Sequence, residues 1–303
     1  MTLLFLSTAE RGAVWQRVFA AAGEPILMGP EAVRDPGEVT HILCWTPPPD
    51  LSVWPKLRVV ICAGAGVDHL PPMPSGVALV RTLAPGIERQ VRDWALMAAL
   101  MLHRGMPGYL DQARQGRWQA HPVAGNATRR IGIMGTGRIG LLLGESLSAL
   151  GFPVAGWNRS GRPAGGMEIY GADRLTEFLG RTDLLIGLLP LTAETRGLMD
   201  AAFLDRLPRG ALLVQAGRGA QLDLDALRAA LDSGRIGAAM LDVTAPEPLP
   251  PDHWAWHDPR VIVTPHVAAV TDHAEGAEHA LAVIAAGRAG QPLPGRVDPA
   301  RGY

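Results

Sequence analysis

Short runs of aliphatic and β-branched residues alternate with longer segments of helical periodicity from one end of the chain to the other. This alternation is typical of parallel sheets that helices cover on both faces. The first third of the sequence has a predicted helix at about Glu10–Ala22 and predicted strands at Leu3–Ser7, His41–Trp45, Val59–Ala63 and Val77–Arg81. The pattern predicts an α/β fold built on mostly parallel sheets.

A second series begins near Arg129 and is long enough to form a doubly wound sheet of its own. Its predicted strands are Arg130–Met134, Val154–Asn158, Asp183–Leu189, Ala211–Ala216, Ala239–Val243 and Val261–Thr264. Predicted helices lie between them, at Arg138–Leu150, Arg174–Leu179, Asp200–Leu207 and Asp225–Ser233. An apolar helix at Arg89–Met101 and a polar arm or linker at Gln112–Thr128 precede this series.

We therefore predict two doubly wound domains. The last periodic segment, about Thr271–Ala289, has only a Pro/Gly-rich tail after it, so we expect it to return and cover the first sheet. The predicted domains are residues 1–95 with 274–303, and residues 96–273.

Composition excludes several classes of protein. The 303 residues are 48 % hydrophobic and 19 % charged with a net charge of −1, which gives no basic surface for nucleic acid and no acidic tail. Cys44 and Cys62 lie in apolar runs and are interpreted as buried side chains in a reducing compartment. The N-terminal apolar stretch is short for a secretory signal, and no run approaches the ~18 residues of a membrane span. We expect a cytoplasmic protein.

A glycine-rich sequence, GTGRIG, follows the predicted strand Arg130–Met134 and opens the next predicted helix. In this position the first glycine permits a tight turn, the second lets a pyrophosphate approach the backbone, and the third packs the helix against the strand. The N–H groups at the start of the helix favour an anion. We predict dinucleotide binding by Gly135, Gly137, Arg138, Ile139 and Gly140.

The second strand of that domain ends in a basic sequence. An NAD site usually has an acid there, about 20 residues after the glycines, whereas this chain has Asn158, Arg159, Ser160 and Arg162. Guanidinium and hydroxyl groups bind a 2′-phosphate that a carboxylate would repel. The sequence predicts NADPH as the preferred cofactor, with NADH still possible; the alternative is that these arginines are solvated loop residues.

Three polar residues follow late strands, at the sheet edge where α/β proteins bind ligands: Arg218, Glu247 and His266. Beside a nicotinamide, His266 can donate the proton that carbonyl reduction needs. Glu247 can orient the imidazole and favour its acid form, and Arg218 can pair with a substrate carboxylate. Each residue alone has an ordinary explanation as a surface or loop residue, but the three together favour catalysis.

His253 and His257 are four residues apart with Asp252 and Asp258 beside them. Because tryptophans lie between them in a Pro-flanked segment, we interpret this stretch as a packed loop and predict no metal site.

Four segments, GTGRIG, QAGRGAQLD, LDVTAPEPLP and TPHVAAVT, resemble in order and spacing the signatures of the D-isomer-specific 2-hydroxyacid dehydrogenases. The family's catalytic Arg, Glu and His correspond to Arg218, Glu247 and His266. The likeness is greatest to the bacterial glyoxylate/hydroxypyruvate reductase A branch and covers nearly the whole chain, including CAGAGVD, WNRS, LLPLTAET and the final VDPARGY. One departure is Gln215-Ala216-Gly217, where many relatives carry Asn and Ala.

The resemblance implies a Rossmann-like cofactor domain and a flavodoxin-like substrate domain with the active site in the cleft. It also implies a homodimer without metal that reduces glyoxylate and hydroxypyruvate, preferably with NADPH. Trp45 would line the substrate pocket, and the backbone at Ala65 and Gly66 would bind the substrate carboxylate together with Arg218. The further contacts implied for the cofactor are Pro190, Thr195, Ala216 and Asp242.

Two other functions stay open. One is a redox-sensing, dinucleotide-binding regulator on the same scaffold, and the other is a dehydrogenase for a bulkier 2-hydroxy acid. The complete catalytic trio favours an enzyme, and NADPH consumption in the presence of glyoxylate separates the enzyme from the regulator.

Overall fold

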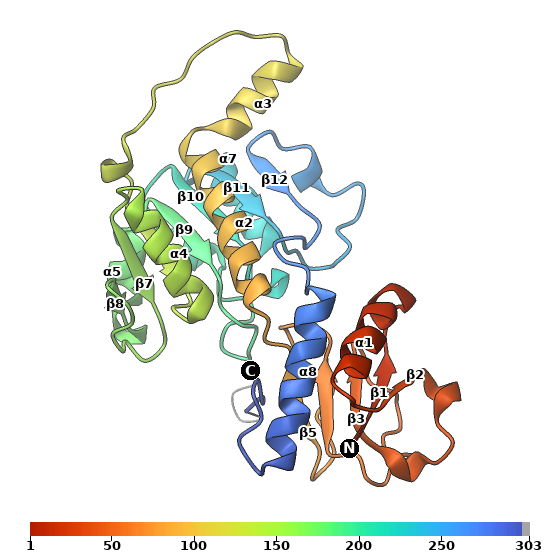
Figure 1. The fold of residues 1–303 in the computed structure, drawn as a ribbon. Coiled ribbons are helices and arrows are strands. Elements are labelled where there is room, and N and C mark those ends of the chain that lie inside the picture. Colours follow the sequence, from red (N-terminus) through yellow and green to blue (C-terminus); the bar gives the residue numbers. More distant parts are fainter. Residues whose placement is uncertain (299–303) are drawn as a thin grey trace. The chain divides into compact units, whose positions relative to one another are not determined.

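The computed structural model describes residues 1–298, so the last five residues of VDPARGY, 299–303, lie outside the described residues. The described chain forms two compact units. Unit 1 is Met1–Ile87 with the segment that starts at Val270, and unit 2 is Glu88–Ala269. The chain first passes from one unit to the other inside helix α2 (Pro85–His103). Both units have a parallel sheet flanked by helices, which confirms the predicted α/β class (Figure 1).

Unit 1 has a five-stranded parallel sheet in the order β2-β1-β3-β4-β5. Its strands are β1 (Thr2–Leu6), β2 (Ile26–Met28), β3 (Val39–Cys44), β4 (Val59–Cys62) and β5 (Ala78–Arg81). Helices α1 (Ala9–Ala21) and α8 (His273–Arg288) pack side by side, and their buried side chains share a core with one face of the sheet. Strand β2, which was not predicted, is a three-residue edge strand and too short to show a period of two.

Unit 2 has a seven-stranded parallel sheet in the order β12-β11-β10-β9-β6-β7-β8. Its strands are β6 (Ile131–Met134), β7 (Val154–Trp157), β8 (Glu168–Tyr170), β9 (Leu184–Gly187), β10 (Ala211–Gln215), β11 (Ile236–Leu241) and β12 (Val261–Val263). The chain builds outward from β6 in one direction through β7 and β8, and then in the other through β9 to β12. Ligands bind at such a reversal, outside the carboxyl ends of the strands.

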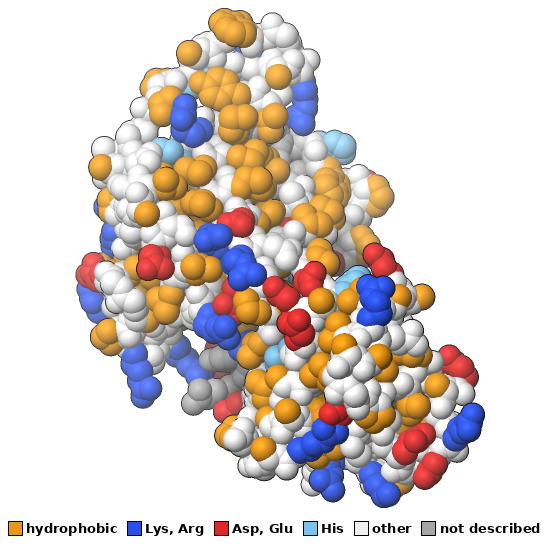
Figure 2. Space-filling view, viewed as in Figure 1, with side chains coloured by type: hydrophobic (Ala, Val, Ile, Leu, Met, Phe, Trp, Pro, Cys, Tyr) orange, Lys and Arg blue, Asp and Glu red, His pale blue; other side chains and the backbone are white. Residues whose placement is uncertain are grey.

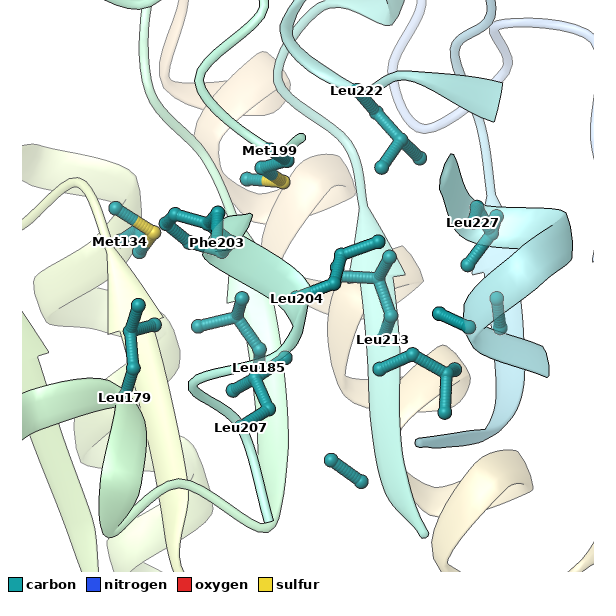
Figure 3. Packing of buried hydrophobic residues seen from close by; sticks show 14 of the residues in the cluster. Met134, Leu179, Leu185, Met199, Phe203, Leu204, Leu207, Leu213, Leu222 and Leu227 are labelled. Carbon is teal, nitrogen blue, oxygen red and sulfur yellow. The ribbon is translucent and has the colours of Figure 1, made fainter. Parts of the chain in front are cut away.

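Helices cover both faces of the unit 2 sheet. On one face α2 and α4 (Arg138–Ala149) pack against the sheet through Ala95, Leu143 and Leu147. On the other face lie α5 (Leu175–Gly180), α6 (Ala201–Leu204) and α7 (Leu224–Asp232). Figure 3 shows this second core, in which Leu179, Phe203 and Leu227 meet side chains of the strands. The central strands β6, β9 and β10 are wholly buried and consist almost entirely of apolar residues, as is typical of parallel strands covered on both faces.

The predicted polar arm is partly helical. Helix α3 (Met106–Arg114) ends just inside it, residues 115–125 contain no helix or strand, and a short 3-10 helix, Asn126–Thr128, closes it. Tyr109 and Gln112 hold this segment at His121, through a hydrogen bond from the His121 N–H to the Tyr109 hydroxyl and a side-chain contact between Gln112 and His121. Within residues 1–298 no helix is both long and apolar enough to span a membrane.

Candidate functional site

The glycine turn lies at the carboxyl end of β6, where the strand order reverses. Gly135 has φ 105°, and Gly137 precedes α4 without any side chain capping the helix. A Cβ on Gly140 would lie 2.0 Å from the Gly135 carbonyl oxygen, and one on Gly135 would lie 2.9 Å from the Leu188 carbonyl oxygen. A Cβ on Gly137 would meet no described atom within 4 Å. The fold itself therefore requires Gly135 and Gly140, whereas Gly137 leaves open space at the helix N-terminus.

Arg138 and Ile139 form the start of α4. The Arg138 side chain is exposed, and its Nε lies 2.9 Å from Glu88 Oε1 on α2. Ile139 is partly buried. These residues position the N-terminus of α4, whose N–H groups and dipole favour an anion.

Asn158 shapes the basic loop after β7. Its Nδ2 donates to Thr136 Oγ1 at 2.8 Å and to the Arg162 carbonyl at 3.2 Å. Its Oδ1 accepts hydrogen bonds from the Ser160 backbone and hydroxyl, at 3.1 and 2.9 Å. The Asn158 amide thus holds the shape of the loop, and Arg159, Ser160 and Arg162 are exposed on it.

The loop after β9 closes on itself. Thr195 Oγ1 donates to the Pro190 carbonyl at 2.7 Å and accepts from the Thr192 N–H at 2.8 Å. The pKa of Glu194 is lowered, first by its hydrogen bond with Thr192 and less by the positive charge of Arg159. This influence indicates that the two loops predicted to contact the cofactor are neighbours.

Arg218 follows β10 and is partly buried. Its N–H donates to Gln221 Oε1 at 2.9 Å, and its Nη1 donates to the Gly217 carbonyl at 2.8 Å. Ala216, just before it, donates from its N–H to the Gly187 carbonyl at 3.0 Å. A Cβ on Gly219 would lie 1.9 Å from the Thr244 carbonyl carbon, so the Arg218 loop touches the loop that leads to Glu247.

Asp242 holds the segment that carries His266. Its carboxylate is buried and accepts hydrogen bonds from the Thr264 hydroxyl at 2.6 Å and from the N–H groups of Val267 and Ala268, both at 2.9 Å. Its carbonyl accepts from the His266 N–H at 2.8 Å. These contacts fix His266 at φ 54°, a left-handed conformation that no other non-glycine residue among 1–298 adopts. The predicted contact of Asp242 with the cofactor stays a prediction.

Glu247 and His266 form the pair that was predicted. His266 Nδ1 lies 2.9 Å from Glu247 Oε2, while Glu247 Oε1 accepts from the Thr244 N–H at 3.0 Å. A carboxylate is an acceptor, so this contact places a proton on Nδ1 and leaves Nε2 for a ligand. The side chains of His266 and Glu247 are 45 % and 39 % exposed, so the pair is accessible.

The remaining predicted residues lie in unit 1, at the carboxyl ends of the neighbouring strands β3 and β4. Trp45 is 55 % exposed and stacks on His69 with ring centroids 4.2 Å apart. Ala65 and Gly66 are partly buried, and among residues 1–298 their N–H groups donate to no protein atom. Cys62 Sγ donates to the Gly66 carbonyl at 3.3 Å, and the Thr82 hydroxyl donates to the Cys62 carbonyl at 2.6 Å.

Within unit 2 the structure brings the Arg218, Glu247 and His266 loops to the carboxyl ends of adjacent strands, β10, β11 and β12. Sequence reasoning missed the polar residues that hold these loops, Thr244, Thr264 and Gln221. A signal exists for Gln221, because a glutamine three residues after a cap position can bind back to the cap N–H.

The chain is similar over its whole length to known proteins of one family. The family model described as D-isomer specific 2-hydroxyacid dehydrogenase, NAD binding domain, matches residues 96–268. The glyoxylate/hydroxypyruvate reductase A of Salmonella heidelberg is 35% identical over 312 residues that cover 100% of both chains.

Two solved structures are similar over the whole chain. A D-isomer specific 2-hydroxyacid dehydrogenase from Xanthobacter autotrophicus, in complex with NADPH and MES, is 35% identical with a TM-score of 0.93 and covers 100% of this chain and 99% of its own. An NADPH-dependent glyoxylate/hydroxypyruvate reductase from Sinorhizobium meliloti, in complex with NADP and sulfate, is 36% identical with a TM-score of 0.90 and the same coverage.

Proposed function

Because this chain belongs to the D-isomer specific 2-hydroxyacid dehydrogenase family, we propose that it is an NADPH-dependent reductase of small 2-oxo acids. Glyoxylate, giving glycolate, and hydroxypyruvate, giving glycerate, are the proposed substrates, since the full-length relatives carry these names. The observation that carries the proposal is the 2.9 Å contact between Glu247 and His266, in the same unit as the glycine turn.

The residues of unit 2 fit a dinucleotide. A Cβ on Gly137 would point into open space at an uncapped helix N-terminus, which suits a pyrophosphate. We assign the pyrophosphate to Gly135, Gly137, Arg138, Ile139 and Gly140. Arg159, Ser160 and Arg162, supported by Asn158, would bind the 2′-phosphate, and the other proposed contacts are Pro190, Thr195, Ala216 and Asp242.

Reduction then follows from the arrangement of the side chains. A nicotinamide bound there would supply a hydride for the carbonyl carbon of the substrate. His266 Nε2 donates a proton to the carbonyl oxygen, and Glu247 stabilises the protonated imidazole through Nδ1. The Arg218 guanidinium pairs with the substrate carboxylate and polarises the carbonyl.

Unit 1 would serve as the substrate-binding part of the enzyme. We propose that the N–H groups of Ala65 and Gly66 bind the substrate carboxylate, since consecutive N–H groups in a turn bind anions. Trp45, which is exposed and stacked on His69, would line the pocket. Unit 2 would serve as the cofactor-binding part.

We further propose that the partner is a second copy of the chain, bound through α2, α3 and the segment after them. Figure 2 shows apolar side chains gathered over the surface of α2 and α3. Met97, Leu110, Trp118 and Val123 are exposed there, Trp118 completely. Exposed apolar patches mark interaction surfaces. Light scattering of the purified protein should give twice the mass of one chain, and Trp118→Asp should shift it toward the monomer.

A panel of 2-oxo acids with NADPH and NADH tests the proposed activity. We expect glyoxylate and hydroxypyruvate to be reduced with higher kcat/KM than bulkier 2-oxo acids, and NADPH to be preferred. A protein that binds NADPH but consumes none with any 2-oxo acid would instead be a regulator on this scaffold. Preference for a bulky acid would favour the other dehydrogenase.

A further inference from the structure

Two glutamine side chains lie buried beneath the loop that carries Arg218. Gln215, the last residue of β10, and Gln221, three residues after Arg218, are both 0 % exposed. Gln215 Nε2 donates to the Arg218 carbonyl at 2.9 Å and to Gln221 Oε1 at 3.1 Å. Its Oε1 is buried without a partner among residues 1–298. A buried amide is costly unless it is bonded, so this pair needs a structural or functional reason.

Gln221 uses both ends of its amide. Its Oε1 accepts from the Arg218 N–H at 2.9 Å, in addition to the bond from Gln215. Its Nε2 donates to the carbonyls of Leu189 and Pro190, at 3.1 and 2.9 Å. One side chain therefore joins the Arg218 backbone to the loop after β9.

The space around this amide is closed. A Cβ on Gly217 would lie 2.5 Å from Gln221 Oε1 and 2.8 Å from the Leu189 carbonyl oxygen. The backbone supports the same link, because the N–H groups of Gly197 and Met199 donate to the carbonyls of Ala220 and Gln221, both at 2.8 Å. The Gln221 amide thus packs against the backbone at Gly217, and side-chain and backbone hydrogen bonds both join the two loops.

We propose that Gln221 is a positioning residue that holds Arg218 in register with the loop formed by residues 188–195. This inference rests on the proposed function, in which Arg218 binds the substrate carboxylate and Pro190 lies beside the cofactor. A donor and an acceptor on one planar group are needed, because the carbonyls of Leu189 and Pro190 require N–H groups while the Arg218 N–H requires an oxygen.

The test compares Gln221→Leu and Gln221→Glu with the wild type. Leucine removes all of these bonds. Glutamate keeps an oxygen for the Arg218 N–H but places a second oxygen opposite two carbonyls. We expect both variants to raise the KM for glyoxylate at least tenfold and to lower kcat, while the Kd for NADPH, followed by its fluorescence, changes less than threefold.

Thr182→Val is the matched control. Thr182 is also 0 % exposed and donates one buried hydrogen bond, from its hydroxyl to the Phe178 carbonyl, at the other end of β9. This variant should lose thermal stability but keep the wild-type KM and kcat. Should the Gln221 variants lose stability and keep wild-type kinetic constants as well, Gln221 is a structural residue and the inference is wrong.

A double-mutant cycle with Arg218→Lys identifies the route of the effect. If Gln221 acts through Arg218, Gln221→Glu lowers kcat/KM much less in the Arg218→Lys background than in the wild type. Equal effects in both backgrounds would overturn the inference. Because glutamate differs little from glutamine in size, this arm remains informative if Gln221→Leu does not fold. A wild-type protein that reduces no 2-oxo acid would refute the proposed function itself, whereas an active wild type with kinetically normal Gln221 variants would refute the inference alone.

Discussion

The loops at the carboxyl ends of the strands are held differently in the two units. In unit 2, buried side chains hold the backbone: Asp242 binds the segment with His266, and Gln221 binds the Arg218 N–H in its own segment and two carbonyl groups of the loop after β9. In unit 1, the Gly64–Val67 loop accepts a hydrogen bond from Cys62 Sγ and one from the Thr82 N–H, while the Thr82 hydroxyl binds the Cys62 carbonyl just before the loop. Trp45 beside the loop is exposed.

This difference indicates a division of work. Groups held by buried hydrogen bonds keep their positions before a ligand arrives, which is what proton transfer and charge stabilisation require. The loop with Ala65 and Gly66 is bound through the carbonyls of Gly64 and Gly66, which leaves the N–H groups of Ala65 and Gly66 for the proposed substrate contact. We expect substitutions of the Glu247–His266 pair in unit 2 to affect mainly turnover, and substitutions around the Gly64–Val67 loop in unit 1 to affect mainly substrate binding.

The largest expected effect tests the unit 2 part of the comparison. His266→Ala should lower kcat by about 10²–10⁴-fold, because it removes the general acid. NADPH binding should change little. His257→Ala is the control, since His257 is exposed and outside the proposed site. Steady-state rates give kcat and a titration gives the Kd for NADPH, for each of the two variants. A fully active His266→Ala enzyme would contradict the mechanism.

A buried histidine of unit 1, His41, should make the free energy of unfolding depend on pH. Burial, together with the positive charges of the N-terminus, Arg288 and Arg58, lowers the pKa of His41 in unit 1 from 6.5 to about 4. The unfolded chain therefore binds this proton first, and stability falls as the pH drops from about 6.5 to about 4, by on the order of 3 kcal/mol. Burial also lowers the pKa of His279 in the same unit.

Urea unfolding across that pH range measures this loss. His41→Gln should flatten the dependence, because the replacement does not titrate. A wild type whose stability is constant over the range, or a His41→Gln variant with the same slope as the wild type, would show that His41 is not the group responsible.

Cofactor choice should depend on the exposed basic loop of unit 2. Arg159→Asp should raise the KM for NADPH by about 10–100-fold, because it removes a charge-assisted hydrogen bond and adds repulsion. The KM for NADH should change much less. Arg174→Asp is a control of the same charge change, since Arg174 is bonded to Glu177 instead. Equal effects of Arg159→Asp on both cofactors would refute the assignment.

The smallest effect concerns unit 1. Thr82→Val removes the hydroxyl bond to the Cys62 carbonyl and keeps the bond from the Thr82 N–H to the Gly64 carbonyl. A loss of about 1 kcal/mol in loop stability should raise the KM for glyoxylate roughly threefold to tenfold at nearly unchanged kcat. Thr82→Ser should restore the wild-type KM. If Thr82→Val instead lowers kcat and leaves KM unchanged, the division of work between the units is wrong.

Much of the fold could be predicted because buried parallel strands are continuous apolar runs. The missed elements lack that signal. Strands β2 and β8 have three residues each, and α3 contains Pro107 and Gly108, which are normally taken as helix breakers. Proline is tolerated there because it occupies the first turn of the helix.

The candidate site was predictable only in part. His266, Glu247 and Arg218 can be found from residue type and position after a strand. The residues that hold them were harder to find. Gln221 has a local cap signal toward Arg218, but its bonds to the Leu189 and Pro190 carbonyls, and the bond from Thr264 to Asp242, join segments that only the sheet brings close. The role of such a buried amide or hydroxyl becomes clear only when its hydrogen-bond partner is known, and the order of the strands decides which segment supplies that partner.

The reversal of strand order at β6 has a consequence for how such an enzyme can evolve. The segment proposed to choose between the two nicotinamide cofactors follows β7, on one side of β6, whereas the side chains proposed to be catalytic follow β10, β11 and β12 on the other. Natural exchange or laboratory grafting of residues 154–170 can therefore alter the electron donor and leave the reaction machinery intact. Cofactor choice and reduction would then depend on separate segments at the edge of one sheet.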